Sequence, residues 1–139
     1  MAESIKLEVV TPEKSVVSEE AQIVMSPGSL GEFGVLIGHT PFLTTLKIGT
    51  IHYKDVGGTE KYVFVNGGFA EALPDKVTVL AESAERRRDI DIERAKASLE
   101  RAQKRLAEDA NKADFDFMRA QVALERAIQR LRISGKGNP

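Results

Sequence analysis

Glycine and proline nearly disappear from this chain after residue 75, and this change restricts its fold more than any other feature. Nine of the eleven glycines and four of the five prolines precede that point, whereas residues 70–134 contain no glycine and residues 75–138 contain no proline. Both residue types interrupt long helices, because proline lacks an N–H donor and glycine loses the most backbone entropy on folding. The sequence therefore predicts two parts of different architecture, residues 1–86 and residues 87–139.

The first part alternates apolar and polar side chains, which is the period of half-buried strands. The alternation is clearest at residues 5–9, 51–53, 62–64 and 77–79. Turn sequences such as Ser26-Pro27-Gly28 and Asn66-Gly67-Gly68 punctuate these segments. No segment looks long enough to be a helical crossover between parallel strands, so we expect antiparallel pairing. The first part is predicted to be a small β-sandwich or barrel.

The second part has helical periodicity in two segments. The apolar positions of the first segment are Ile92, Ala95, Leu99, Ala102 and Leu106, and those of the second are Phe117, Ala120, Leu124, Ile128 and Leu131. Asp89 or Asp91 can cap the first helix, Asp114 or Asp116 can cap the second, and Gly135 is a suitable stop. Because the connection between them is short and polar, the sequence predicts an antiparallel helical hairpin.

This hairpin has a narrow apolar seam that is half alanine, so it buries little surface. Each large apolar side chain contributes roughly 1.5–3 kcal/mol, whereas ordering each residue costs roughly 1–2 kcal/mol. We expect the hairpin to be marginally stable alone and to need the sandwich, a ligand or a partner. It is therefore a candidate moving part.

Composition and charge argue against several functional classes. The chain has no cysteine, so disulfides and thiolate chemistry are excluded. The longest apolar runs are too short to cross a bilayer, and the first residues do not resemble a secretion signal, so we expect neither insertion nor secretion. The net charge is −1, with an acidic first part and a mildly basic, strongly mixed second part. Such a mixed pattern disfavours binding to nucleic acid.

The candidate catalytic residues are few. The loop PGSLGEFGVLIGH matches neither common phosphate-binding motif, and the two histidines, His39 and His52, lack the spacing of a zinc helix. A small hydrolase using His39 stays open as an alternative, because triads are assembled in space. Glu32 and His39 are polar residues in this glycine-rich loop, which is either a solvated tip or a contact surface.

The charged face of the helices is also open to two interpretations. Charges three and four residues apart can simply form a solvated face laced with ion pairs. Alternatively, Arg119, Arg126 and Arg130 of the second helix follow a helical repeat and, with arginines of the first helix, could hold an anionic ligand in a shared groove. A generic adaptor with a coiled-coil tail is the remaining alternative.

Three stretches of the sequence carry a resemblance to a known family. The segments GEFGVLIGHTPFLTTLKIGTI and YVFVNGGFAEALPDKVTVLAESAERRRDIDIERA, followed by a helix pair ending ALERAIQRLRIS, closely resemble the epsilon subunits of F-type ATP synthases over nearly the whole chain. One departure is visible, because the family commonly has Leu-Pro-Gly-His where this chain has Leu36-Ile37-Gly38-His39. The resemblance implies an antiparallel β-sandwich of about ten strands followed by the two-helix hairpin.

The resemblance also implies a function without catalysis by this chain and without a required cofactor or metal. In that family the sandwich binds the gamma subunit and rests on the c-ring of the rotor stalk, through a loop that corresponds here to Glu32, Gly38 and His39. The hairpin either folds on the sandwich or extends toward the catalytic alpha and beta subunits, where it inhibits ATP hydrolysis. The implied location is peripheral, at the cytoplasmic face of a bacterial inner membrane.

A regulatory ATP site is implied for some bacterial members, which carry the motif I/L-D-x-x-R-A. This chain has the motif at residues 90–95, as Ile90, Asp91, Ile92, Glu93, Arg94 and Ala95. The ATP-binding residues implied by similarity are Glu85, Ile90, Asp91, Arg94, Ala95, Arg119, Arg126 and Arg130. ATP would act there as a regulatory ligand and would not be turned over.

Overall fold

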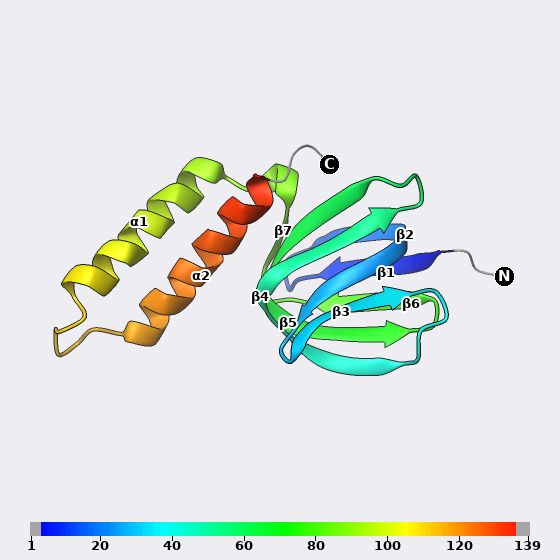
Figure 1. The fold of residues 1–139 in the computed structure, drawn as a ribbon, viewed down its shortest axis with the longest axis horizontal. Helices are drawn as coiled ribbons and strands as arrows, with labels where there is room; N and C mark the ends of the chain where they lie inside the picture. The colour runs from blue at the N-terminus through cyan, green and yellow to red at the C-terminus, as the bar shows by residue number, and fades with distance from the viewer. Residues whose placement is uncertain (1–3, 136–139) are drawn as a thin grey trace.

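The computed structural model describes residues 4–135 and divides into a β-sandwich and a helical hairpin (Figure 1). The strands of the sandwich are β1 (Ile5–Val10), β2 (Ser15–Gly28), β3 (Gly31–Leu36), β4 (Phe42–Asp55), β5 (Glu60–Leu73), β6 (Lys76–Leu80) and β7 (Ala84–Arg86). A short 3₁₀ helix, η1 (Arg87–Asp89), leads to α1 (Ile92–Glu108) and α2 (Phe117–Ser134). The predicted fold class is confirmed.

The strands form one sheet that closes on itself. Its order is β1-β6-β5-β4-β2-β3, β7 pairs with β5, and β1 also pairs with β2. The predicted alternation holds in β1, where Ile5, Leu7 and Val9 are fully buried in the sandwich core. Val77 and Val79 of β6 lie in the same core. A closed sheet with an alternating pattern places one apolar face inside, while β3 and β7, which each pair with a single strand, remain at an edge.

The structure has seven strands between residues 4 and 135, fewer than the ten or so that the family resemblance implies. Three of them, β2, β4 and β5, run through 14 residues each. Asn66-Gly67-Gly68 lies within β5, and Ser26-Pro27-Gly28 lies at the end of β2, so these sequences do not separate strands as predicted. A long strand has two sets of neighbours: β5 pairs with β7 at residues 63–65 and with β6 at residues 69–73.

The prediction that all strands pair antiparallel is wrong for one pair. β1 and β6 pair in parallel, from Lys6 opposite Lys76 to Val10 opposite Leu80. These strands are far apart in sequence, so closure of the sheet brings them together and no helical crossover is needed. The close approach of β6 also explains Gly68, whose φ is +127°, because a Cβ atom there would lie 2.2 Å from the carbonyl oxygen of Leu80.

The two helices begin and end where the sequence predicts. Asp91 accepts a hydrogen bond from the backbone N–H of Arg94, and Asp116 accepts one from that of Arg119, both at 3.0 Å. Gly135 follows the last turn of α2. These are ordinary N-cap bonds, which satisfy N–H groups that lack a partner within the helix.

The seam between the helices is even thinner than predicted. The buried residues of α1 are Ala95 and Ala102, and those of α2 are Ala120, Ala127 and Ile133, of which Ile133 packs against the sandwich. Ala127 takes the place expected for Ile128, while Ile92 and Phe117 are 43% and 54% exposed. Alanine-lined helices approach closely but remove little apolar area from water, so the hairpin gains little stability from its own seam.

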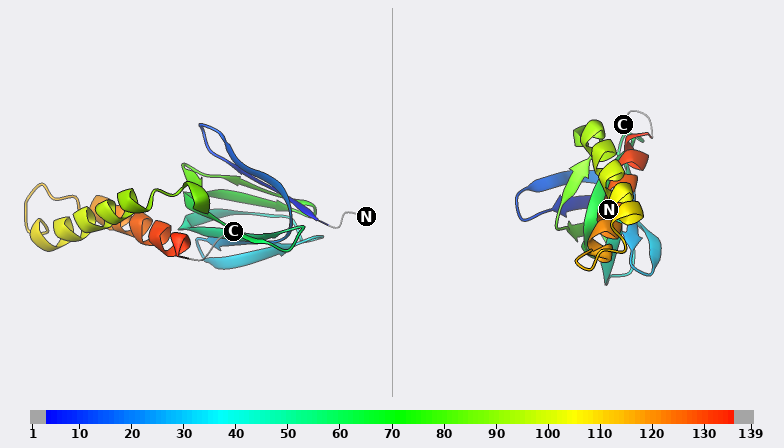
Figure 2. Two further views of the ribbon diagram at one scale, coloured as in Figure 1. Left: turned by 90° about the horizontal axis from the view of Figure 1, so that it is seen from above. Right: turned by 90° about the vertical axis from the view of Figure 1, so that its left-hand side faces the viewer.

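The hairpin extends away from one end of the sandwich, with its connecting loop at the far end (Figures 1 and 2). Helix α2 contacts β4, β5 and η1, whereas α1 packs on α2. The contact with the sandwich centres on a small apolar cluster of Phe64, Ile90 and Ile133, with Ile48 and Tyr62 packed against it. We call these five residues the docking cluster.

Candidate functional site

A groove of about 400 Å³ lies where the hairpin meets the sandwich. It is lined by Glu85, Asp89, Asp91, Arg94, Ala95, Ser98, Ala123, Arg126 and Arg130. Strand β7 contributes Glu85, the two helices contribute the arginines, and the chain entering α1 contributes both aspartates. We call it the hairpin groove.

Arg130 connects the hairpin to the sandwich within this groove. Its Nε donates a hydrogen bond to Oε1 of Glu85, and its guanidinium lies over the ring of Phe64, 4.4 Å from the centroid. Both side chains of the ion pair are more than two thirds buried. A guanidinium that pairs with a carboxylate and stacks on a ring is held in one orientation, so Arg130 is preorganised.

Arg94 and Arg126 lie on the two facing helices. Asp91 fixes the start of α1 through its N-cap bond to Arg94 N–H, and the small residues Ala95 and Ala123 leave room between the helices. The groove combines three arginines with the acids Glu85, Asp89 and Asp91. Such a lining suits a ligand that carries anionic oxygens at one end and hydrogen-bond donors at the other.

The structure brings together most, but not all, of the predicted ATP-binding residues. Arg119 lines a neighbouring groove of about 220 Å³, which shares Ser98, Ala123 and Arg126 with the hairpin groove. Ile90 is buried against Phe64 and Ile133, so it belongs to the docking cluster and does not line the groove.

Three residues of the groove were missed in the sequence. Ser98 lies one helical turn after Arg94, and Ala123 lies three residues before Arg126, so helical spacing could have identified both. Asp89 precedes α1 within η1, and no periodicity identifies it.

The residues predicted to form one partner-contact loop are separated in the structure. Glu32 lies near the start of strand β3, opposite Pro27, and its carboxylate is 3.7 Å from Nε2 of His52. Gly38 and His39 follow the other end of β3; Gly38 N–H donates to the carbonyl oxygen of Pro74 at 2.6 Å. The predicted glycine-rich loop contains a six-residue strand, because its apolar residues extend the sheet along β2.

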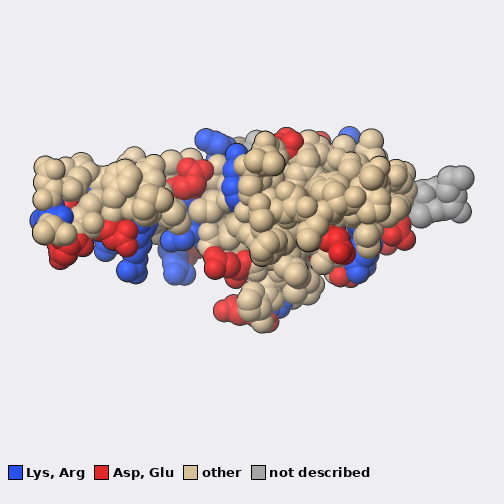
Figure 3. Space-filling model, turned by 90° about the horizontal axis from the view of Figure 1, so that it is seen from below, with Lys and Arg blue, Asp and Glu red and all other residues tan. Residues whose placement is uncertain are grey.

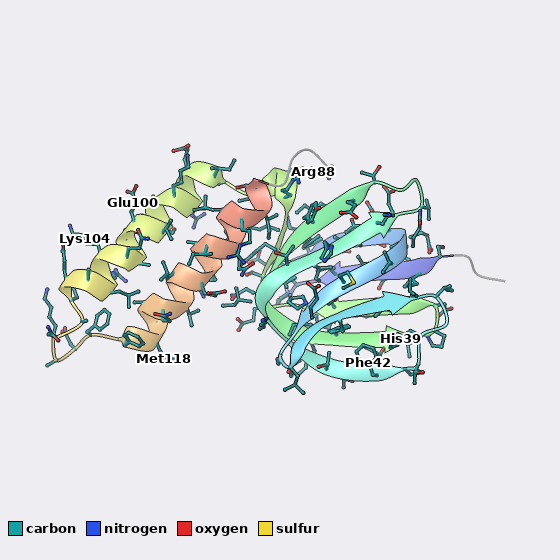
Figure 4. All side chains as sticks on the ribbon, in the orientation of Figure 1. His39, Phe42, Arg88, Glu100, Lys104 and Met118 are labelled. Carbon is teal, nitrogen blue, oxygen red and sulfur yellow. The ribbon has the colours of Figure 1, made fainter. Side chains whose placement is uncertain are left out.

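His39 itself has a simple environment (Figure 4). Its Nδ1 lies 2.7 Å from the backbone carbonyl oxygen of Thr40, and its ring packs edge-on against Phe42 with centroids 5.0 Å apart. Since a carbonyl only accepts, Nδ1 carries the proton in this contact. A backbone carbonyl and a phenyl ring provide neither the nucleophile nor the carboxylate that the hydrolase alternative requires.

A second polar cluster lies at the edge of the sandwich. Glu19 accepts hydrogen bonds from the Tyr53 hydroxyl at 2.9 Å and from Lys61 Nζ at 2.9 Å, and Arg86 Nη1 lies 3.4 Å away. Burial alone would raise the pKa of Glu19, but the bonds from Lys61 and Tyr53 and the charges of Lys61 and Arg86 outweigh it, so the pKa is lowered. The hydrogen bond to Glu19 is the main cause of the raised pKa of Lys61.

The hairpin surface carries both signs of charge (Figure 3). Glu100 and Lys104, for example, are exposed on α1 (Figure 4). This part of the charged face is a solvated surface, whereas the arginines of the groove have a lining role. Neither of the helices described between residues 4 and 135 is long and apolar enough to span a bilayer.

Comparison with known proteins gives consistent results for both parts. Residues 4–87 match the family model of the ATP synthase delta/epsilon chain β-sandwich domain, and residues 88–135 match that of its long α-helix domain. The chain is 67% identical over 106 residues to the ATP synthase epsilon chain of Desulfosudis oleivorans, covering 76% of this chain and 80% of that one. It is 70% identical over 108 residues to that of Desulforapulum autotrophicum, covering 78% and 80%.

The fold is also found in solved structures. A chain in the cryo-EM structure of the Euglena gracilis mitochondrial ATP synthase, with OSCP, F1 and c-ring, superposes with a TM-score of 0.79 at 23% identity, covering 93% of this chain and 80% of that chain. A chain of the Tetrahymena thermophila mitochondrial ATP synthase central stalk and c-ring gives a TM-score of 0.54 at 13% identity, covering 95% and 94%.

Proposed function

The chain belongs to the ATP synthase delta/epsilon family as an epsilon chain of the central stalk, and we propose that it is a non-catalytic rotor subunit whose hairpin restrains ATP hydrolysis. In this proposal the sandwich binds the gamma subunit and the c-ring, with Glu32 on one contact and Gly38 and His39 on another. The hairpin, when extended, meets the alpha and beta subunits. The complex lies at the cytoplasmic face of a bacterial inner membrane, with this chain peripheral to it.

Regulation in this proposal depends on ATP bound in the hairpin groove. The supporting observation is that β7 of the sandwich and both helices of the hairpin, α1 and α2, line the groove together. Arg94 and Arg126 would hold the phosphates, while Glu85 and Asp91 accept hydrogen bonds from the base. A ligand that touches all three elements binds only while the hairpin is docked on the sandwich, so it stabilises the docked state.

The size of the effect follows from linkage. A ligand that binds only the docked state stabilises it by about 2.7 kcal/mol at one hundred times its dissociation constant. This energy shifts a one-to-one equilibrium to about 99:1. ATP therefore acts as a signal of energy supply, and its withdrawal releases the hairpin toward the catalytic subunits.

Calorimetric titration of the isolated chain with ATP tests the ligand assignment. We expect saturable binding that weakens by about tenfold or more in Arg126→Gln, because a charge-assisted hydrogen bond contributes about 1.5–3 kcal/mol. Arg132→Gln is the matched control, since Arg132 is an exposed arginine of the same helix outside the hairpin groove. Equal affinities in the two variants, or no heat with the unaltered chain, would contradict the assignment.

A further inference from the structure

Three consecutive arginines, Arg86 to Arg88, lie where the chain leaves the sandwich (Figure 4 labels Arg88). With Lys61 of β5 they line a cavity of about 430 Å³, and Glu19, Tyr53, Tyr62 and Val63 complete its wall. We call it the arginine cavity. It shares no lining residue with the hairpin groove.

The charge of the arginine cavity is poorly balanced. Its lining contains four cationic side chains and one carboxylate, that of Glu19. Glu19 already accepts from Tyr53 and Lys61 and pairs with Arg86, and Lys61 also pairs with Asp55 at 3.3 Å. The carboxylates of Glu19 and Asp55 are therefore already paired with Lys61 and Arg86. Arg87 and Arg88 therefore contribute the excess positive charge.

Arg87 shows the imbalance most clearly. Its side chain is only 7% exposed, and both terminal nitrogens, Nη1 and Nη2, are buried without a hydrogen-bond partner. The guanidinium lies over the ring of Tyr62, 5.3 Å from the centroid. A ring face attracts the positive charge but does not replace acceptors for the N–H groups, and a buried donor without an acceptor is costly. The site lacks an acceptor.

We propose that the arginine cavity binds the phosphate group of a small soluble molecule, at a site distinct from the hairpin groove. Arg87 lines the cavity, and a phosphate group there would offer the acceptors that its guanidinium lacks once that side chain turns toward the ligand. Arg88, which is exposed, supplies a second cation directly. The volume lies in the range of small-molecule sites. The proposal does not depend on movement of the hairpin or on ATP binding there.

Nuclear magnetic resonance titration of the ¹⁵N-labelled chain with inorganic phosphate, at constant ionic strength, tests this site. We expect saturable shifts of the Arg87 side-chain N–H signals and of the amides of residues 61–63. Arg87→Met and Arg88→Met should each weaken binding by about tenfold, the factor for one charge-assisted hydrogen bond. Arg88→Met removes an exposed side chain, so it keeps the test valid if Arg87→Met fails to fold.

One control locates the binding. Arg132→Met, which alters neither the arginine cavity nor the hairpin groove, should leave the phosphate dependence of these signals unchanged. Glycerol 3-phosphate serves as a second probe: tighter binding than inorganic phosphate indicates an organic phosphate as the natural ligand, and equal binding indicates phosphate itself. The proposal is overturned by unsaturable shifts, by unchanged affinity in Arg88→Met, or by an equal loss of binding in Arg132→Met.

Discussion

Replacement of Ile133 by alanine should release the hairpin from the sandwich without unfolding the sandwich. Ile133 is fully buried in the docking cluster, where it meets Phe64 and Ile90. It is the last large apolar residue of α2 and lies at the end of the helix nearest the sandwich (Figure 1). Its truncation therefore removes apolar contact from the junction while leaving the core of the sandwich intact.

Ile133→Ala should remove a large share of the free energy that holds the hairpin on the sandwich. Truncating a buried isoleucine to alanine typically costs about 2–5 kcal/mol, because it loses transfer free energy and leaves a cavity. Even the lower value of about 2 kcal/mol shifts the docking equilibrium about 30-fold toward the released state. Ile128→Ala is the matched control: Ile128 is half-buried on the same helix and lies outside the docking cluster.

Amide hydrogen exchange measured by mass spectrometry distinguishes release from unfolding. In Ile133→Ala we expect peptides of α1 and α2 to exchange faster by about 30-fold, while peptides of β4 and β5 retain their protection. Ile128→Ala should have a much smaller effect on both. Equal loss of protection in α2 and β5 would mean that hairpin and sandwich unfold as one unit. Unchanged exchange of α2 would mean that Ile133 does not hold it.

Three further predictions concern changes to the sandwich and to its boundary with the hairpin. Gly68→Ala should destabilise the chain by about 2 kcal/mol or more in urea unfolding. The φ of residue 68 is +127°, and the new Cβ atom would meet the carbonyl oxygen of Leu80. Gly57→Ala is the control and should change stability little, because its Cβ atom would meet no backbone atom within 4 Å. The folded pKa of Glu19 lies below its ordinary value of 4.5, so the ionised side chain stabilises the fold above about that pH, and this contribution is lost as the pH falls through the folded pKa. The free energy of unfolding of Glu19→Gln should therefore fall less between pH 7 and pH 3 than that of the unaltered chain. An equal fall would contradict this role. Deletion of the residues after Arg88 should leave a folded sandwich that still binds gamma but no longer restrains ATP hydrolysis by the assembled catalytic head; unchanged inhibition in a hydrolysis assay would reject the proposed role of the hairpin.

The division of the fold could be predicted because glycine, proline and the hydrophobic period all change over the same short region. The number of strands could not, because Asn66-Gly67-Gly68 is a turn sequence that here lies within β5. Gly68 is required by the close approach of another strand, and local sequence does not distinguish that requirement from a turn. The parallel pairing of β1 with β6 likewise depends on closure of the whole sheet.

The candidate site could be predicted where helical spacing carries the information. Arg94, Arg126 and Arg130 lie together in the groove because they occupy facing sides of two helices. The family resemblance implies that Ile90 contacts ATP, but the fold places this residue in the docking cluster. Its position depends on Phe64, whose strand is buried on both faces: Val63 and Val65 face the sandwich core, while Phe64 faces the hairpin. Alternation within one strand does not reveal that a helix covers the outer face.

A thin interface is a physical requirement for control by a ligand of modest affinity. Ligand binding at one hundred times the dissociation constant supplies about 2.7 kcal/mol, which governs an equilibrium only when the two states differ by a comparable energy. Each fully buried large side chain contributes about 1.5–3 kcal/mol, so two additional ones at the junction would exceed what the ligand supplies. The docking cluster has three fully or nearly fully buried members, and much of their contribution is offset by the cost of ordering the hairpin. Enlarging the cluster would therefore fix the hairpin on the sandwich whether ATP is present or absent.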